Sequence, residues 1–284
     1  MNILLFDLEN GSKSLGNHTH IQKEFGLPVL SPTTFDQFNN TIGQIYEIVN
    51  EEVDVKVGNL TVKEHRTVVK SKDPQLTIDA IVVDTFSELS KKFQRSLCDN
   101  EGMMKLNSWG KLKNKLDRVL EYITRLPGVV ICNCHAKMST MDNGESKMLP
   151  YIDGSTKEDI SKWFDFVLYT KTINYPSGEN KYVWHTGHTS MYDHAKDRTQ
   201  LLDREIDQNY QTVLQAANER GFEGAKILVI GSPGTGKTLA LRTLNSTNVE
   251  TKKTSKPKVK TKATTVEVTT NGAGTEIPTT TTTV

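Results

Sequence analysis

Few of the features that mark membrane or secreted proteins occur in this sequence. No apolar run approaches the length needed to cross a bilayer, and residues 1–7 are too short and too acidic for a signal peptide. Three cysteines among 284 residues (Cys98, Cys132 and Cys134) do not make a disulfide framework. The 35 basic and 34 acidic residues give a net charge of +1, which is no global sign of attraction to nucleic acid or membranes. We therefore expect a soluble, cytoplasmic protein without a membrane partner.

Aromatic residues are missing after Phe222, and Thr, Lys, Pro and Gly dominate from about residue 247. A segment of this composition cannot bury enough apolar surface to offset the chain entropy lost on folding. We therefore predict a disordered tail over residues 247–284, after a single domain over residues 1–246. Its lysines make the tail locally basic; we interpret it as a solvated tail, with an electrostatic contact to nucleic acid as the alternative.

Short apolar runs alternate with helical patterns along the domain. Residues 35–49 and 109–123 repeat apolar side chains at three- and four-residue steps, and residues 208–220 form a third helical pattern that Gly221 ends. The apolar runs have the length and composition of buried strands: residues 2–8, 78–84, 129–134, 164–170, 181–186 and 227–230. Strands that alternate with helices predict an α/β fold with a doubly wound, mostly parallel sheet.

Residues 53–70 break this rhythm. Valines alternate with polar residues over residues 53–57, Gly58 and Asn59 supply a turn, and the alternation returns from Leu60. We interpret the segment as a β-hairpin insertion, which is either an edge ribbon or a partner-binding element.

The segment 231–238 carries the strongest motif in the chain. It reads Gly231-Ser232-Pro233-Gly234-Thr235-Gly236-Lys237-Thr238, follows an apolar strand and precedes a helical run that begins at Leu239. Glycines at these positions let backbone N–H groups turn inward around phosphate oxygens, and the helix N-terminus adds partial positive charge. In such a loop Lys237 reaches the β- and γ-phosphates and the Thr238 hydroxyl binds Mg²⁺. The sequence therefore predicts an ATP-binding phosphate loop over residues 231–239.

No aspartate follows Asp207, so an aspartate that helps to bind magnesium must come from an earlier strand. The run Ile81-Val82-Val83-Asp84-Thr85 supplies one at the carboxyl end of a buried strand. That edge of an open α/β sheet is where ligands bind. Asp84 is therefore our candidate metal ligand beside Thr238, although taken alone it would fit a structural cap equally well.

Several segments together resemble RecA-like ATPases. Residues 4–11 (LLFDLENG) resemble the strand whose glutamate activates the attacking water, residues 81–89 resemble the Walker B strand, and residues 129–135 resemble the strand that ends in a γ-phosphate sensor. Within the family the chain is most similar to phage-encoded AAA/RecA-like ATPases of the single-strand-annealing type, which often carry a late Lys-x-Arg.

The resemblance implies a role for four further residues. Glu9 would polarise the water, His135 would report the γ-phosphate, and Lys196 or Arg198 would act as a finger, on the ATP of a neighbouring subunit. Each role has a plainer alternative. Glu9 also fits a loop carboxylate, Asn133 is an alternative sensor, and Lys196 and Arg198 lie in a charged stretch typical of a solvated face.

The order of these segments differs from that of the family. RecA-like ATPases run from the phosphate loop through the glutamate strand and the Walker B strand to the sensor, whereas here the phosphate loop comes last. We interpret this order as a circular permutation, cut in the loop between the phosphate-loop helix and the glutamate strand. The predicted fold is unchanged, because a sheet needs its strands adjacent in space rather than in one chain order.

Two other motifs are interpreted as structural. Residues 114–117 spell the guanine-reading Asn-Lys-x-Asp motif, but they fall inside a helical pattern with Leu116 on its apolar side, which argues against GTP. Cys132, Cys134 and His135, with three later histidines, suggest zinc, but the alternation of a strand puts His135 on the face opposite the cysteines. We expect these to be small buried cysteines.

The resemblance implies a Mg-dependent ATPase that acts in phage DNA recombination or single-strand annealing. It implies ATP and Mg²⁺ as cofactors, single-stranded DNA and further copies of the chain as partners, and the host cytoplasm as the location. A nucleotide-gated binding module with little or no hydrolysis is the alternative. A small-molecule kinase is disfavoured because no arginine-rich lid is evident.

Overall fold

A computed structural model describes residues 1–17, 19, 21–22, 28–141, 144–176 and 178–245. All of them lie in the first of the two units into which the chain divides, Met1–Val249. The tail predicted over residues 247–284 lies outside the described residues. No helix in the described part of the chain is long and apolar enough to span a membrane.

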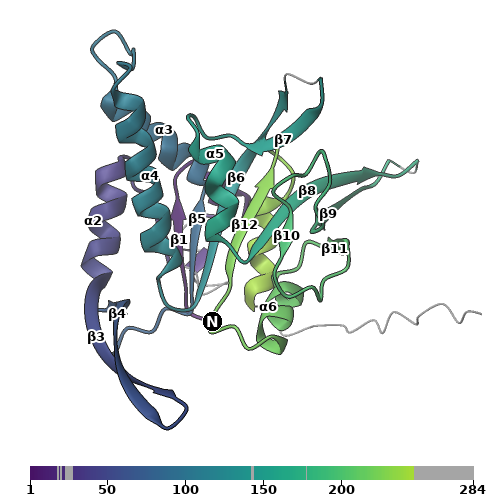
Figure 1. The fold of residues 1–284 in the computed structure, drawn as a ribbon. Helices are drawn as coiled ribbons and strands as arrows, with labels where there is room; N and C mark the ends of the chain where they lie inside the picture. Colours follow the sequence, from purple (N-terminus) through teal and green to yellow (C-terminus); the bar gives the residue numbers. More distant parts are fainter. Residues whose placement is uncertain (18, 20, 23–27, 142–143, 177, 246–284) are drawn as a thin grey trace, which may run out of the picture. The chain divides into compact units, whose positions relative to one another are not determined.

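A ten-stranded sheet runs through the described residues (Figure 1). Its main path is β11-β9-β8-β12-β6-β5-β1-β2, with β10 paired to β8 and β7 paired to β6. Neighbours from β8 to β2 along this path are parallel, and the other pairs are antiparallel. The strands are β1 (Ile3–Asp7), β2 (Val29–Leu30), β5 (Ala80–Asp84), β6 (Val129–Thr140), β7 (Ser146–Pro150), β8 (Phe166–Asn174), β9 (Asn180–His185), β10 (Lys196–Asp197), β11 (Glu205–Asp207) and β12 (Lys226–Gly231). The predicted α/β fold with a mostly parallel sheet is confirmed.

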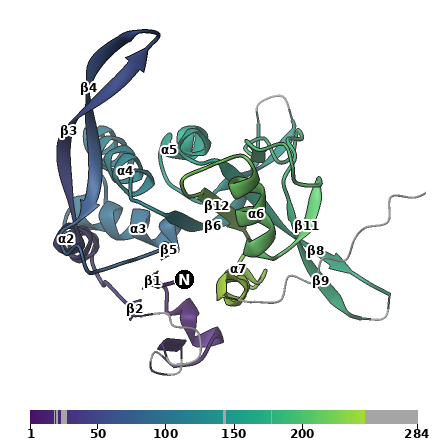
Figure 2. The ribbon, with the colours of Figure 1, turned by 90° about the horizontal axis from the view of Figure 1, so that it is seen from below.

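Helices cover both faces of the sheet, as the view from below shows (Figure 2). Side chains of α2, α3 and α4 pack on one face, and those of α6 and the segment that follows α7 pack on the other. The helices are α2 (Phe35–Ile45), α3 (Phe86–Leu97), α4 (Ser108–Thr124), α5 (Thr156–Asp159), α6 (Tyr210–Glu219) and α7 (Lys237–Ala240), with 3-10 turns η1 (Gly11–Ser14), η2 (Ile160–Trp163) and η3 (Leu241–Asn245).

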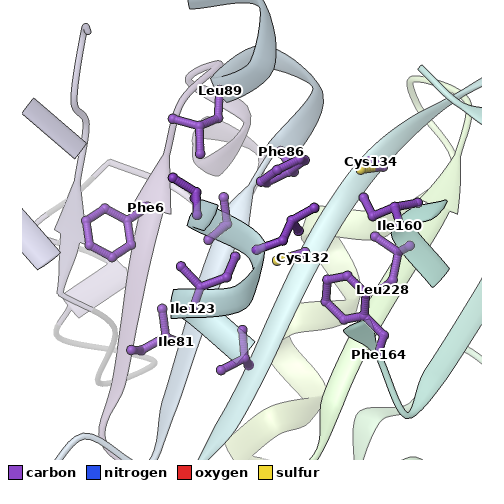
Figure 3. Close-up of a cluster of buried hydrophobic side chains, with 14 of the residues drawn as sticks. Phe6, Ile81, Phe86, Leu89, Ile123, Cys132, Cys134, Ile160, Phe164 and Leu228 are labelled. Carbon is purple, nitrogen blue, oxygen red and sulfur yellow. The ribbon is translucent and has the colours of Figure 1, made fainter. Parts of the chain in front are cut away.

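The larger core cluster lies between the sheet and α2, α3 and α4 (Figure 3). Phe6 of β1, Phe86 of α3 and Leu228 of β12 belong to it and are fully buried. Cys132 and Cys134 share this cluster, and burial raises the pKa of the Cys134 thiol to about 12. Both cysteines are therefore small core residues that stay protonated at neutral pH.

An ammonium group is built into the base of the sheet. Lys226 Nζ, at the start of β12, donates hydrogen bonds to the carbonyl oxygens of Leu126 and Gly128, both at 2.7 Å, just beyond the end of α4. Burial lowers the pKa of Lys226 to about 8. The first residue of β12 is thus tied to the turn that precedes β6.

Three local expectations differ from the structure. The helix expected over residues 35–49 ends at Ile45, because from Tyr46 the apolar residues alternate and the chain continues as a strand. Trp109 lies at the start of α4 but is 39% exposed and is not part of the core. Helix α3 was not predicted, although Thr85 caps it by accepting a hydrogen bond from the N–H of Glu88 at 3.2 Å, in the Thr-x-x-Glu pattern of a capping box.

Residues 46–71 form a separate two-stranded antiparallel sheet of β3 (Tyr46–Val57) and β4 (Leu60–Ser71). The strands join at Gly58 and Asn59, and their pairing begins earlier in the chain than the alternation over residues 53–57 indicates. The Asn-Lys-x-Asp motif lies within α4, where Leu116 is fully buried and Asn114 is exposed.

Candidate functional site

The glycine-rich loop joins the end of β12 to the start of α7. A β-carbon on Gly231 would lie 2.7 Å from Cβ of Thr170 and 2.8 Å from Oγ1 of Thr235, so the position has no room for a larger residue. Gly236 precedes α7 with φ of 82°, in the left-handed region that favours glycine. The loop is therefore a tight turn of backbone, which is the form a phosphate cradle requires.

Lys237 turns back into this loop and is 6% exposed. Its Nζ donates to the carbonyl oxygens of Gly231 at 2.8 Å and Ser232 at 2.9 Å. Burial lowers the pKa of Lys237, although the nearby Asp84, Cys134 and Glu9 act to raise it. A buried ammonium held by neutral carbonyl oxygens favours an anionic ligand, because an anion would offset the lost hydration.

Thr238 meets the aspartate of β5 across the sheet edge. Its Oγ1 donates to Oδ2 of Asp84 at 2.6 Å, and Nδ2 of Asn133 donates to the other carboxylate oxygen at 3.1 Å. The parallel register sets this meeting, because Asp84 pairs with Asn133 on β6 and β6 pairs with β12. Burial raises the pKa of Asp84, and the charge of Asp7 adds to that rise, while the two hydrogen bonds oppose it. A bound cation would stabilise the ionised form of this buried carboxylate.

The turn after β1 closes over this pair. A β-carbon on Gly11 would lie 3.4 Å from Thr238 Oγ1 and 3.5 Å from Asp84 Oδ2, so the glycine leaves space beside both oxygens. The carboxylate of Asp7 holds the turn by accepting from the N–H groups of Gly11 at 3.0 Å and Ser12 at 3.1 Å. Hydroxyl and carboxylate oxygens are ligands that Mg²⁺ accepts. The residues present therefore fit a magnesium ion.

The number of protein ligands also fits that ion. Within the described residues no three His, Cys, Asp or Glu side chains are grouped so as to hold a metal ion. Mg²⁺ usually binds through one or two carboxylates together with substrate phosphates and water, rather than in an all-protein cage. Asp84 and Thr238 would supply a site of this incomplete kind.

Glu9 follows β1 and lies between Thr85, just after β5, and His135 of β6. It accepts from Thr85 Oγ1 at 2.6 Å, and His135 Nε2 lies 2.9 Å and 2.8 Å from its two carboxylate oxygens. Burial alone would raise the pKa of Glu9, but the hydrogen bonds from His135 and Thr85 and the charges of His135 and Lys237 outweigh it, so the pKa is lowered. Glu9 is thus a carboxylate at neutral pH, and its side chain stays 28% exposed.

The two candidate sensors on β6 have different contacts. His135 faces Glu9, and its backbone N–H donates to Oγ of Ser87 at 2.9 Å. Asn133 is fully buried and holds Asp84. Of the pair, His135 has the side chain that contacts the exposed carboxylate.

Lys196 and Arg198 lie near the end of β12 opposite the glycine-rich loop. Arg198 Nη1 donates to Asp165 Oδ1 at 2.9 Å, and Asp165 also accepts from the N–H of Lys226, the first residue of β12. Lys196 Nζ donates to the carbonyl oxygen of Ser161 at 2.8 Å. The glycine-rich loop leaves the other end of β12, so the structure does not bring these two cations to the loop of their own chain. A role at a neighbouring subunit stays a prediction.

The remaining predicted loop residues form the outer surface of the turn: Ser232, Pro233, Gly234 and Leu239 are exposed. Gln208 contacts the inner turn and was missed by the sequence analysis. Its Nε2 donates to the carbonyl oxygen of Thr235 at 3.1 Å, and its Oε1 lies 2.8 Å from where a β-carbon on Gly236 would be. Only its place just before the start of α6 could have drawn attention to it.

Comparison with known proteins gives one family. The family model described as the AAA domain matches residues 1–199, which is more than half of the chain. The matched region contains β1, β5 and β6 with Glu9, Asp84 and His135, and it ends before the glycine-rich loop. No curated protein and no solved structure matches significantly.

Proposed function

Because the chain belongs to the AAA domain family, whose members bind nucleotides and are generally ATPases, we propose that it binds MgATP at residues 231–239 and hydrolyses it. One observation carries this proposal above the others. The hydroxyl of Thr238 lies 2.6 Å from the buried carboxylate of Asp84, although 154 residues separate them in the chain. This contact supports the proposal because it brings the glycine-rich loop after β12 next to a carboxylate at the end of β5.

The loop and two flanking side chains would hold the nucleotide. Backbone N–H groups of the turn and the ammonium of Lys237 receive the phosphate oxygens, and Gln208 supports the turn from behind. Thr238 and Asp84 would hold Mg²⁺, which supplies charge neutralisation on the phosphates when bound. Gly11 keeps the space beside those two oxygens clear.

Glu9 and His135 would act on the terminal phosphate. Water adds to the γ-phosphorus as the bond to the bridging oxygen breaks and ADP leaves. Glu9 accepts a hydrogen bond from that water, and the proton that the water loses passes to the released phosphate or to solvent. The lowered pKa of Glu9 keeps it in the form that can accept. His135 already contacts both oxygens of Glu9, so a phosphate that binds near His135 would change the electrostatic environment of the carboxylate.

The chain order is that of a circularly permuted RecA-like core in this proposal. Two observations support it. Strand β12 pairs in parallel with β6 on one side and β8 on the other, so the last described strand completes the middle of the sheet. The family match ends at residue 199, which leaves the phosphate loop outside it.

The resemblance to phage ATPases extends the proposal to a biological role. The protein would act in phage DNA recombination or single-strand annealing in the host cytoplasm, with single-stranded DNA and further copies of itself as partners. Lys196 and Arg198, at the sheet edge away from the loop, would serve as fingers only toward the ATP of a neighbouring subunit.

The experiment is ATP turnover by the purified protein with and without single-stranded DNA. Lys237→Ala is the blank and Glu9→Gln is the chemical test, each checked by circular dichroism for an intact fold. We expect turnover that rises with DNA, no turnover in either variant, and ATP binding retained in Glu9→Gln. ATP binding without turnover in the unaltered protein would exclude the ATPase proposal, and turnover indifferent to DNA would exclude the annealing role.

The contacts of Glu9 support a second candidate, a nucleotide-gated binding module. Both oxygens of this carboxylate are already held, by Thr85 and His135, which suits a switch that reports the nucleotide. In that case turnover would be negligible in the unaltered protein, Glu9 would be dispensable, and Glu9→Gln would bind ATP as the unaltered protein does.

A further inference from the structure

The two-stranded sheet of β3 and β4 is held to the rest of the chain only near its base. Tyr46 is 3% exposed and Val69 is 6% exposed, and both belong to the core cluster beside α2. Toward the turn the strands project beyond α2 (Figures 1 and 2), and Val57 and Leu60 are 60% and 71% exposed. Two-stranded hairpins are marginally stable in water, and further strands stabilise them.

One face of this hairpin is mostly apolar. Alternation puts every second residue of each strand on that face, and the cross-strand register pairs them. Charged side chains interrupt it in two places: Glu51, Glu64 and Arg66 near the middle, and the pair Glu47 and Lys70 near the base. The apolar members are Val49, Val53, Val55, Val57, Leu60, Val62 and Val68.

Both outer edges of the hairpin lack a strand partner within the described residues. The edge of β3 is unsuited to pairing with itself, because Glu51 or Glu52 would meet its own copy near the centre. The edge of β4 differs. Its Lys63 and Lys70, which would otherwise repel an incoming strand, are each ion-paired to a glutamate of β3.

We propose that the free edge of β4 pairs antiparallel with β4 of a second copy of this chain, about a two-fold axis at His65. In that register Val62 lies opposite Val68 of the second copy, and Glu64 lies opposite its Arg66. Because the axis is two-fold, each contact occurs twice. The result is a four-stranded sheet, β3-β4-β4-β3, that closes as a dimer.

The sequence of β4 selects this register over its neighbours. Moving the axis by one residue puts Glu64 opposite Glu64 or Arg66 opposite Arg66, and like charges directly opposite are unfavourable. Of these three axes, the one at His65 puts Val62 opposite Val68 and Glu64 opposite Arg66, while Leu60 then lies opposite Lys70 at the two ends of the pairing. Glu64 and Arg66 are now ion-paired within one strand at 2.7 Å and are about half exposed, so both are available to a second copy. This surface lies apart from the nucleotide site and does not depend on the proposed ATPase activity.

The test uses single charge reversals on the full chain without nucleotide, with mass measured by light scattering over a concentration series. We expect twice the chain mass for the unaltered protein and the monomer mass for both Arg66→Glu and Glu64→Arg, because each variant opposes like charges twice. Lys56→Glu, which makes the same charge change on β3, is the matched control and should stay a dimer.

Mixing the two monomeric variants is the decisive step. Arg66→Glu carries two acids and Glu64→Arg carries two bases, so only the mixed pair is complementary and a dimer should return. The ion pair within each strand is broken in both variants, so recovery reports contact between chains. A monomer at every concentration, a dimer unaffected by either reversal, a ladder of higher oligomers, or no recovery on mixing would each overturn the proposal.

Discussion

Replacing Gly11 with alanine is a sharp test of the proposed magnesium site. The new β-carbon would lie 3.4 Å from Thr238 Oγ1 and 3.5 Å from Asp84 Oδ2, which is ordinary contact in the absence of a metal. Gly11 is not among the residues with positive φ, so alanine fits its backbone. The fold should therefore tolerate the methyl group, and the free energy of unfolding should stay within about 1 kcal/mol of the unaltered protein.

The nucleotide complex should not tolerate it. An octahedral magnesium ion with its water ligands needs the space beside these two oxygens. Added methyl groups in filled sites usually cost about 1–3 kcal/mol, which corresponds to a loss of roughly 5- to 150-fold in affinity. Titration calorimetry with a non-hydrolysable ATP analogue, with and without Mg²⁺, measures this loss of affinity. We expect the loss in the presence of Mg²⁺ and little change without it, because Lys237 and the loop are untouched.

Gly110→Ala is the matched control, because a β-carbon there meets nothing within 4 Å. Gly110 lies in α4, far along the chain from the loop, and its alanine variant should bind as the unaltered protein does. The reasoning is refuted if Gly11→Ala keeps the full magnesium-dependent affinity. An equal loss with and without Mg²⁺ would also refute it, since the methyl group would then be disturbing the loop itself.

Three shorter predictions follow from the same contacts. Gln208→Ala removes the hydrogen bond to the carbonyl of Thr235 and should weaken nucleotide binding by about 0.5–1.5 kcal/mol without unfolding the protein, as titration would show; unchanged affinity would mean that the turn needs no support. Lys226, with its pKa lowered to about 8, binds fewer protons in the folded than in the unfolded chain between about pH 8 and 10.5, so its contribution to the free energy of unfolding should rise by about 3 kcal/mol across that window. Denaturation of the unaltered protein and Lys226→Met over that range measures the difference, and a flat difference would contradict it. Arg198→Ala should leave nucleotide binding by its own chain unchanged within about twofold, because Arg198 is held by Asp165 at the other sheet edge; a larger loss would put the cation at the loop.

The parts of the fold that the sequence predicts are those with a local signal. The runs 78–84 and 227–230 are apolar on both faces and end at polar residues, so their strands appear close to the expected bounds. The run 129–134 marks only the inner half of β6. Beyond His135, which still pairs with β12, residues 136–140 pair with β7, and their mixed composition carries no sign of that pairing.

The residues of the candidate site likewise divide into those with a local sequence signal and those without one. The phosphate loop is contiguous in the chain, and the rule that parallel strands present their carboxyl ends at one edge brings Asp84 to it. Gln208 and Gly11 reach the site through contacts 27 and more residues away in the chain, for which no local pattern exists. Val49 shows the converse failure, because its spacing fits a helix from residue 35 and also fits the alternation of β3. Pairing with Val68 settles the choice.

The position of β12 in the sheet leads to a last prediction, which concerns the order of the segments in the chain. This strand pairs on both sides, with β6 and with β8, so the sheet depends on its place in space and not on how it is joined to the chain. A rearranged protein that starts at Gly224, runs to Asn245, and continues through a flexible linker into Met1 and on to Glu223 restores the order of the RecA-like family.

The change in connection should cost little, because doubling the length of a loop costs only about 0.6 kcal/mol. We expect the rearranged protein to unfold cooperatively and to bind the ATP analogue within about tenfold of the original, a difference of about 1.4 kcal/mol. The same rearrangement carrying Lys237→Ala is the control for binding at the loop. A rearranged chain that is soluble but unfolded would show that the present order is needed for folding, and the interpretation of the chain as a permuted family member would fail with it.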